Sequence, residues 1–213
     1  MQLTKYTHAC VRFDDGDRAL VIDPGTFSEV ETALDGATAV LITHEHADHI
    51  DVDRLSAAAH KDPRLRIWAP AGVAATLGEL GEQVVAVAPG ESFDAHGFAV
   101  RTFGGQHALI HPTIPVVANV GYLVNDTVYH PGDSLIVPPV PVNTLLVPIQ
   151  APWSKSGEVI DFVISVRAAT VHQIHDGLLN KIGLGFTEGH VQRLGAQHGS
   201  EFRHLDPTET VDL

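Results

Sequence analysis

A buried strand that leads directly into a group of histidines constrains this chain more than any other feature. Residues 39–43 read AVLIT, an apolar run rich in β-branched residues that predicts a buried strand. The next six residues are HEHADH and carry three imidazoles and a carboxylate at His44, His46, Asp48 and His49. Neutral imidazole and ionised carboxylate are the ligands that borderline divalent metals prefer. A solvated, histidine-rich loop is the alternative, but the position after a buried strand favours a metal site.

The composition is that of an ordinary globular protein and excludes several function classes. A length of 213 residues with 44% hydrophobic and 18% charged residues predicts one domain over residues 1–213. The formal net charge of −13 disfavours a nucleic-acid backbone or an anionic membrane as partner. The single cysteine, Cys10, excludes an internal disulfide, and the opening MQLTKYTHAC lacks a basic stretch followed by an apolar one. We therefore expect a cytoplasmic protein.

Strand and helix signals follow one another in two similar halves of the chain. The patterns predict strands over residues 2–7, 10–13, 18–22, 39–43, 66–69, 83–87, 98–103, 117–124, 127–130, 144–147, 169–171 and 201–205. They predict helices over residues 28–34, 52–60, 71–77, 156–166, 176–184 and 188–197. Two β-rich halves with helices on the outside indicate a layered α/β sandwich.

Motifs spread along the chain resemble the ordered ligand set of the metallo-β-lactamase superfamily. They are Asp23 in VIDPG, the HEHADH segment, His107 after a glycine pair, Asp133 in HPGDS and a histidine in the last quarter of the chain. HxHxDH is highly specific, whereas each other motif is weak alone. The segments GGQHA and YHPGDS look most like the metal-dependent hydrolases related to ascorbate-6-phosphate lactonase. The resemblance implies a four-layer αββα sandwich with metals at the edge between two sheets.

The resemblance also implies a ligand set for two divalent ions. The residues that match the family positions are His44, His46 and His107 for the first ion, Asp48, His49 and His175 for the second, and Asp133 as the bridge. We expect zinc, although histidine and aspartate ligands also admit manganese and iron.

Two of these positions have rivals in the sequence. His111 lies one short loop beyond His107, and His172 precedes His175 in VHQIHDG. The motif position favours His107, which follows two glycines, and His175, which precedes the next expected helix. His172 would then be a supporting or core histidine.

Four further residues have two interpretations each, and a fifth, Cys10, has one. Asp23 is either a turn residue or a partner that orients a ligand histidine or the HEHADH backbone. His8 either faces the site or lies on the surface, and His130 either supports the site or packs at a strand end. Trp153 either lines a substrate pocket or serves as a core or lid aromatic residue, and Cys10 is expected to be a small buried residue.

The resemblance implies a hydrolase that uses a metal-bound hydroxide on a small ester, lactone or phosphodiester. Asp48 is the expected catalytic residue, because a carboxylate beside the metals can orient the hydroxide or relay its proton. Aspartate at position 133, where β-lactam-cleaving relatives carry cysteine, disfavours antibiotic hydrolysis. The alternatives are a di-iron redox protein and a non-catalytic binding domain on the same fold. A small-molecule substrate is expected, and the sequence leaves homo-oligomerisation open.

Overall fold

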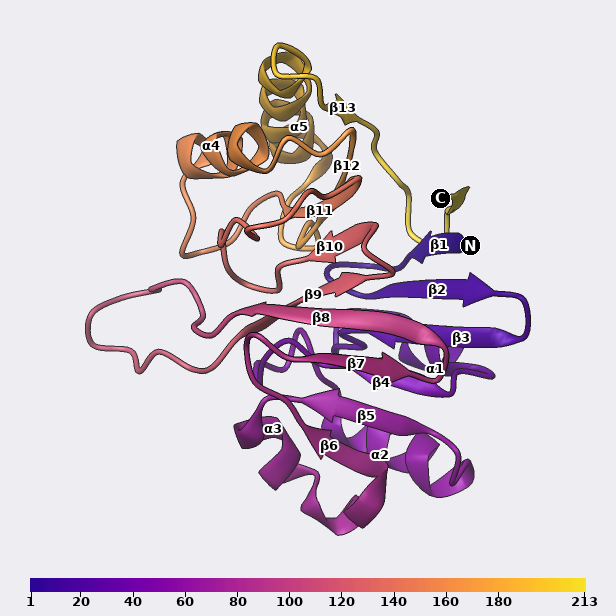
Figure 1. The fold of residues 1–213 in the computed structure, drawn as a ribbon. Helices are drawn as coiled ribbons and strands as arrows, with labels where there is room; N and C mark the ends of the chain where they lie inside the picture. The colour runs from indigo at the N-terminus through magenta and orange to yellow at the C-terminus, as the bar shows by residue number, and fades with distance from the viewer.

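The computed structural model describes all 213 residues, which form two seven-stranded mixed sheets flanked by helices (Figure 1). The first sheet has the order β14-β1-β2-β3-β4-β5-β6 and the second has the order β13-β12-β11-β10-β9-β8-β7. The strands of the first sheet are β1 (Gln2–Lys5), β2 (Val11–Asp15), β3 (Arg18–Ile22), β4 (Ala39–Leu41), β5 (Arg66–Ala69), β6 (Val84–Ala86) and β14 (Thr210–Asp212). Those of the second are β7 (Ser92–Ala95), β8 (Phe98–Gly104), β9 (Val120–Val124), β10 (Val128–His130), β11 (Thr144–Pro148), β12 (Thr170–Ile174) and β13 (Glu201–Phe202).

The helices cover the outer faces of the two sheets and complete the predicted four-layer αββα sandwich (Figure 1). The first sheet packs against α1 (Val30–Leu34), α2 (Val52–Lys61) and α3 (Ala71–Thr76), and the 3₁₀ helix η1 (Gly78–Gln83) follows α3. The second sheet packs against α4 (Ser156–Val166) and α5 (Lys181–Ala196). None of these helices has the length and apolarity needed to cross a membrane.

The strands next to the site are apolar on both faces, as expected for strands between two buried layers. In β3, Leu20 and Ile22 point into the core between the sheets, whereas Val21 joins the core under the helices. In β4, Leu41 likewise points into the core between the sheets, whereas Val40 joins the core under the helices. This burial explains why the AVLIT run has no polar alternation.

Parallel pairing sets the direction in which the site loops leave the sheets. Strands β3 to β6 are parallel to one another, and so are β10 to β13. Loops that follow the carboxyl ends of parallel strands meet at one edge of an open sheet, which is where such sheets usually bind ligands. The residues after β3, β4, β10 and β12 therefore converge.

The prediction of two helices over 176–184 and 188–197 was wrong, because one continuous helix, α5, spans Lys181–Ala196. Four glycines weaken its helix propensity, but packing against α4 outweighs that cost. The side chain of Asn180 caps its start by accepting from the backbone N–H groups of Ile182 and Gly183. The edge strands β7 and β14 were not predicted from the sequence, and β13 is shorter than expected.

Candidate metal centre

Every predicted ligand lies on a loop at the edge between the two sheets. The HEHADH segment follows β4, His107 follows β8, Asp133 follows β10 and His175 follows β12. The ligand atoms of His44, His46 and His107 lie within 4.8 Å of one another. Those of Asp48, His49 and His175 form a second such group together with His8. Each group therefore contains the three residues that were predicted to bind one ion, and the second group also contains His8.

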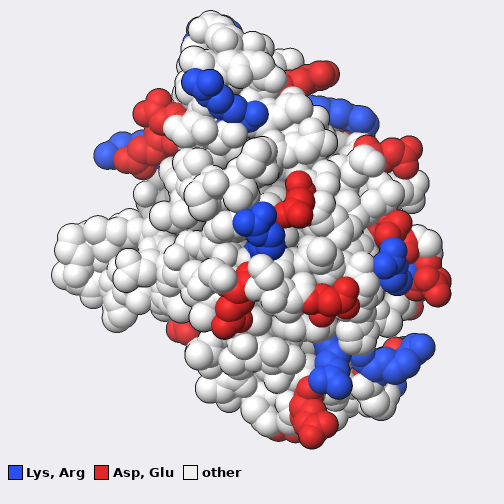
Figure 2. Space-filling model, in the orientation of Figure 1, with Lys and Arg blue, Asp and Glu red and all other residues white.

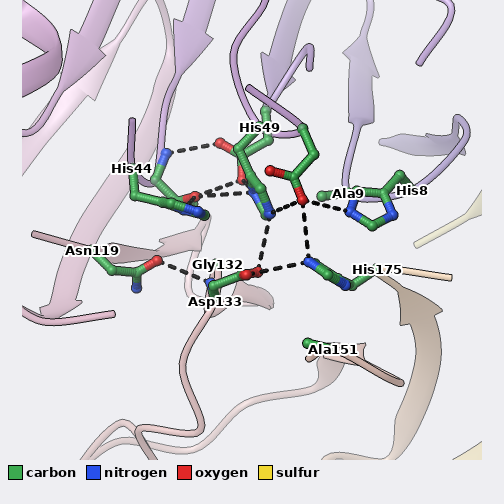
Figure 3. A network of polar contacts seen from close by, with 12 residues as sticks. His8, Ala9, His44, His49, Asn119, Gly132, Asp133, Ala151 and His175 are labelled. Carbon is green, nitrogen blue, oxygen red and sulfur yellow. Dashed lines mark hydrogen bonds and ion pairs between the residues drawn. The ribbon is translucent and has the colours of Figure 1, made fainter. Parts of the chain in front are cut away.

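Asp133 connects the two groups. Its Oδ1 lies 3.0 Å from Nε2 of His49, and its Oδ2 lies 3.2 Å from Nε2 of His175 (Figure 3). The same Oδ2 lies 3.2 Å from Nε2 of His107. The carboxylate is 3% exposed, so water does not screen these interactions. Asp133 therefore holds the position expected of a bridging ligand.

Two glycines allow the loops to approach this closely. A Cβ atom on Gly25 would lie 1.9 Å from the backbone oxygen of Asp48, so the DPG turn needs glycine to pack against the HEHADH loop. Gly132 has a φ of +62°, and a Cβ atom there would lie 2.3 Å from Oδ1 of Asn119. The VIDPG and HPGD motifs are thus required by close backbone contacts beside the site.

The ligand imidazoles are held through Nδ1, which leaves Nε2 free. Nδ1 of His44 lies 3.0 Å from Oγ1 of Thr43 and Nδ1 of His49 lies 2.6 Å from Oδ2 of Asp23. Nδ1 of His107 donates to its neighbour's backbone carbonyl at 2.6 Å, and Nδ1 of His175 donates to a carbonyl at 2.7 Å. These partners are acceptors, so they fix the tautomer with a lone pair on Nε2.

Several buried polar atoms at the centre have no hydrogen-bond partner. They are Nε2 of His44, His49, His107 and His175, and Oδ1 of Asp133. Native proteins rarely leave such atoms unsatisfied, and each one costs about 1–3 kcal/mol when buried. Imidazole nitrogens and a carboxylate oxygen that face one another without hydrogen-bond geometry fit a divalent cation. The residues present therefore fit the metal site that the sequence predicts.

Asp23 orders the HEHADH loop from behind. Its Oδ1 accepts from the backbone N–H of Thr43 at 2.8 Å, and its Oδ2 accepts from the Thr43 hydroxyl at 2.6 Å. The same Oδ2 contacts Nδ1 of His49, and the Thr43 hydroxyl can in turn accept from His44. One fully buried carboxylate thus orients two expected ligands, which agrees with the orienting interpretation of Asp23.

His8 holds Asp48 in place. Nδ1 of His8 accepts from the backbone N–H of Gly177, so Nε2 carries the proton and donates to Oδ2 of Asp48 at 3.1 Å. Burial alone would raise the pKa of Asp48, but the nearby imidazole of His175 and the hydrogen bond from His8 outweigh it and hold that pKa well below its usual range. His8 therefore faces the site, and its hydrogen-bonding pattern is that of a donor to Asp48 rather than a ligand.

The carboxylates and imidazoles of the centre shift one another's pKa values. Burial opposes protonation of His49 and His175, but Asp133, with Asp23 or Asp48, outweighs it and raises the pKa of His49 well above 6.5 and that of His175 to about 9. Burial disfavours the ionised form of Asp133, yet the surrounding imidazoles of His49, His107 and His175 keep its pKa well below the ordinary range. Burial, with help from His49, holds the pKa of His44 well below the usual value for histidine. An ionised carboxylate beside a neutral imidazole is the donor set that a divalent metal binds best.

The rival histidines lie elsewhere. His111 is exposed, and its Nδ1 contacts Oγ1 of Thr113. His172 donates through Nδ1 to the backbone carbonyl of Arg203 and belongs to neither ligand group. His130 is fully buried, donates to the backbone carbonyl of Ala9 at 2.9 Å and lies 4.0 Å from Asp23. It therefore packs behind the site, next to the carboxylate that orders the HEHADH loop.

Three contributions to the site had no clear signal in the sequence. Nε1 of Trp153 donates to Oδ2 of Asp133 at 2.8 Å, although the sequence predicted only a pocket-lining role or that of a core or lid aromatic residue. Oδ1 of Asn119 accepts from the backbone N–H of Asp133 at 2.9 Å (Figure 3). Thr43 ends the AVLIT run directly before HEHADH, and neither pattern indicates its contacts with Asp23 and His44. Trp153 and Asn119 both contact Asp133 but lie far from it in the sequence, so no local motif indicates these contacts.

Comparison with known proteins agrees with this geometry. Residues 2–175 match the model of the beta-lactamase superfamily domain. The chain is 39% identical to Protein Rv0786c of Mycobacterium tuberculosis, over 99% of each chain. It is also 31% identical to a UPF0173 metal-dependent hydrolase of Xanthobacter autotrophicus, over 63% of this chain and 62% of that protein.

Solved structures share the fold. Igni18, a metallo hydrolase from Ignicoccus hospitalis, superposes with a TM-score of 0.75 at 19% identity and covers 99% of this chain and 97% of its own. CmlA, a diiron β-hydroxylase from Streptomyces venezuelae, superposes with a TM-score of 0.76 at 17% identity over all of this chain but only 54% of its own. At these identities the likeness shows the fold alone.

The chain belongs to the metallo-β-lactamase superfamily. Within it, the fold, the histidine and aspartate cluster and the relatives named as hydrolases define the class as metal-dependent hydrolases.

Proposed function

We propose that this protein hydrolyses a small ester, lactone or phosphodiester at a centre of two divalent ions, with zinc as the resident metal. The observation that carries the proposal is the set of buried, unpartnered Nε2 atoms facing Asp133. His44, His46 and His107 would hold one ion, Asp48, His49 and His175 the other, and Asp133 both. When bound, such ions lower the pKa of a coordinated water towards about 7 and polarise the oxygen under attack.

The chain's own residues supply the proton chemistry and the positioning. Asp48 is held ionised by the imidazoles of His175 and His8, and its side chain is 22% exposed, so it can orient an attacking water and take its proton. His8 fixes the direction of that carboxylate from the side opposite solvent, because its ring is fully buried. Trp153 donates to Asp133 and covers part of the centre next to His107 and His175.

The test is metal analysis together with turnover. Purified protein is expected to contain two equivalents of metal by mass spectrometry and to cleave generic ester, lactone or phosphodiester probes, with activity lost on chelation and restored by zinc. His46→Ala and Asp133→Ala should lose both stoichiometric metal and turnover, whereas His60→Ala, at an exposed position on α2, should lose neither. Retention of two metals in both site variants would refute the ligand assignment. A visible absorption band in the purified protein would indicate iron rather than zinc.

A further inference from the structure

The loops around the centre offer almost no cationic side chain to a ligand. Six segments carry or border the site residues: 23–29, 43–51, 105–119, 131–143, 149–155 and 175–180. Their one lysine or arginine is Lys155, which directly precedes α4 and pairs with Glu158 at 3.3 Å. Lys5, which lies close to the loop after His175, is 1% exposed and pairs with Asp176 at 2.9 Å, so it is not free to bind a ligand. A substrate with its own negative charge would find acidic groups here, and both nearby ammonium groups, those of Lys5 and Lys155, are already paired with carboxylates.

The loop 105–119 is also strongly apolar. It projects away from the edge of the sheets between β8 and β9, and the projection in the space-filling view shows no charged atoms (Figures 1 and 2). Leu109, Ile110, Ile114 and Val116 are all exposed on it, Leu109 by 55%. Isolated exposed apolar residues are ordinary, but several on one uncharged loop mark a binding surface.

This loop is joined directly to the centre. The backbone N–H of His107 donates to the carbonyl of Val117 at 3.0 Å and closes the base of the loop. The next N–H, that of Ala108, donates to the carbonyl of Asp133 at 2.8 Å. The exposed apolar surface therefore starts at Leu109, two residues beyond an expected ligand.

Other exposed apolar side chains lie on the remaining site loops. Phe27 is 48% exposed, and its ring lies edge-on to His8 with centroids 5.2 Å apart. Ile136 and Val137 are exposed just after Asp133, and Leu178 is exposed just after His175. Apolar groups thus surround the centre on loops from both sheets.

We propose that the substrate is an uncharged ester or lactone with an apolar chain or ring, and that this apolar part binds against the loop 105–119 and Phe27. The inference rests on the proposed hydrolysis and narrows its substrate class, because it disfavours anionic phosphodiesters. The apolar loops supply binding free energy through burial, and the centre supplies the chemistry.

The test uses the zinc-loaded protein and three 4-nitrophenyl esters. Octanoate and acetate differ in chain length, whereas octanoate and hydrogen suberate share a chain length and differ by a terminal carboxylate. We expect kcat/KM for octanoate to exceed that for acetate by about tenfold or more, because burial favours each methylene. We expect hydrogen suberate to be about tenfold poorer than octanoate. Equal values for the three esters, or a preference for hydrogen suberate, would overturn the inference.

Variants locate the effect. Phe27→Ala and Leu109→Ser should reduce the ratio of octanoate to acetate turnover several-fold. Phe186→Ala, at a 71% exposed phenylalanine on α5, is the matched control and should leave the ratio unchanged. If only Phe186→Ala changed the ratio, the binding surface would be elsewhere and the inference would be wrong.

A binding measurement separates this inference from the proposed function. Calorimetry with octanohydroxamate and acetohydroxamate should show tighter binding of the longer probe, and Leu109→Ser should reduce the difference. If no ester is cleaved but this preference holds, the proposed hydrolysis fails and the apolar surface stands. If wild-type protein sediments as a dimer, Leu109→Ser sediments as a monomer and the chain-length preference is absent, the loop binds a second copy and the inference is overturned.

Discussion

Oδ2 of Asp23 lies 2.6 Å from Nδ1 of His49, and neither side chain has any exposed surface. The pair joins the end of β3 to the loop that follows β4, and it determines which nitrogen of His49 faces the centre. Oriented in this way, His49 presents Nε2 to the centre beside Asp133. The strength of metal binding should therefore depend on a residue that is not itself a ligand.

Asp23→Asn tests this dependence. The amide oxygen can still accept from the backbone of Thr43, but the amide nitrogen cannot accept from Nδ1 of His49. We expect the affinity for zinc to fall about 10–100-fold, measured by competition with a chromophoric chelator. Asp53→Asn, at an exposed position on α2, is the control. Wild-type affinity in Asp23→Asn would show that the tautomer of His49 is fixed by something else.

His8→Asn tests whether His8 positions Asp48 or binds metal. His8 has a φ of +69°, a conformation that asparagine tolerates better than most residues, so the backbone should persist. We expect two equivalents of metal to remain while kcat falls about tenfold or more, because Asp48 loses its donor. His96→Asn, at an exposed position with a φ of +52°, is the matched control. Loss of one metal equivalent in His8→Asn would make His8 a ligand.

Trp153 should report on metal binding through its fluorescence. The chain has two tryptophans, and Trp68 stacks on Phe93 in the core between the sheets, whereas Trp153 donates to Asp133. Zinc added to the metal-free protein should change the emission of wild type and of Trp68→Phe, and should leave that of Trp153→Phe unchanged. Trp153→Phe should also bind zinc about tenfold more weakly, because a hydrogen bond to a charged group is lost. An emission change retained in Trp153→Phe would contradict this arrangement.

His204 should make stability depend on pH away from the metal centre. Partial burial opposes protonation, but the hydrogen bond with Glu188 at 2.6 Å outweighs it and raises the pKa of His204 above 6.5. The stabilisation is therefore complete below pH 6.5 and disappears as the pH rises through the folded-state pKa. Because the pair is partly exposed, it contributes less than about 1 kcal/mol.

Glu188→Gln tests this pair. The substitution should lower Tm more at pH 6 than at pH 9, and NMR titration should show a lower pKa for His204. Glu201→Gln, at an exposed position on β13, is the control. An equal loss of Tm at both pH values would mean that Glu188 stabilises α5 by other contacts.

Local sequence patterns were sufficient where neighbouring residues make the structure. The helix expected over residues 52–60 is present as α2, and Asp51 directly before it accepts from the backbone N–H of Arg54. The strands expected over residues 10–13 and 18–22 are present as β2 and β3, which pair on either side of Gly16, whose φ is +66°. The two helices predicted over 176–197 failed, because packing of α5 against α4 is a long-range contact.

The sequence by itself determined which residues are available to bind metal, because HEHADH concentrates imidazoles and a carboxylate after a buried strand. Only the tertiary structure decided which distant histidines join them. His107 and His175 meet at Asp133, whereas His111 and His172 do not, since the course of each loop depends on backbone contacts with other strands. The hydrogen bonds of His8 and Trp153 likewise exist only because folding brings separate strands to one edge.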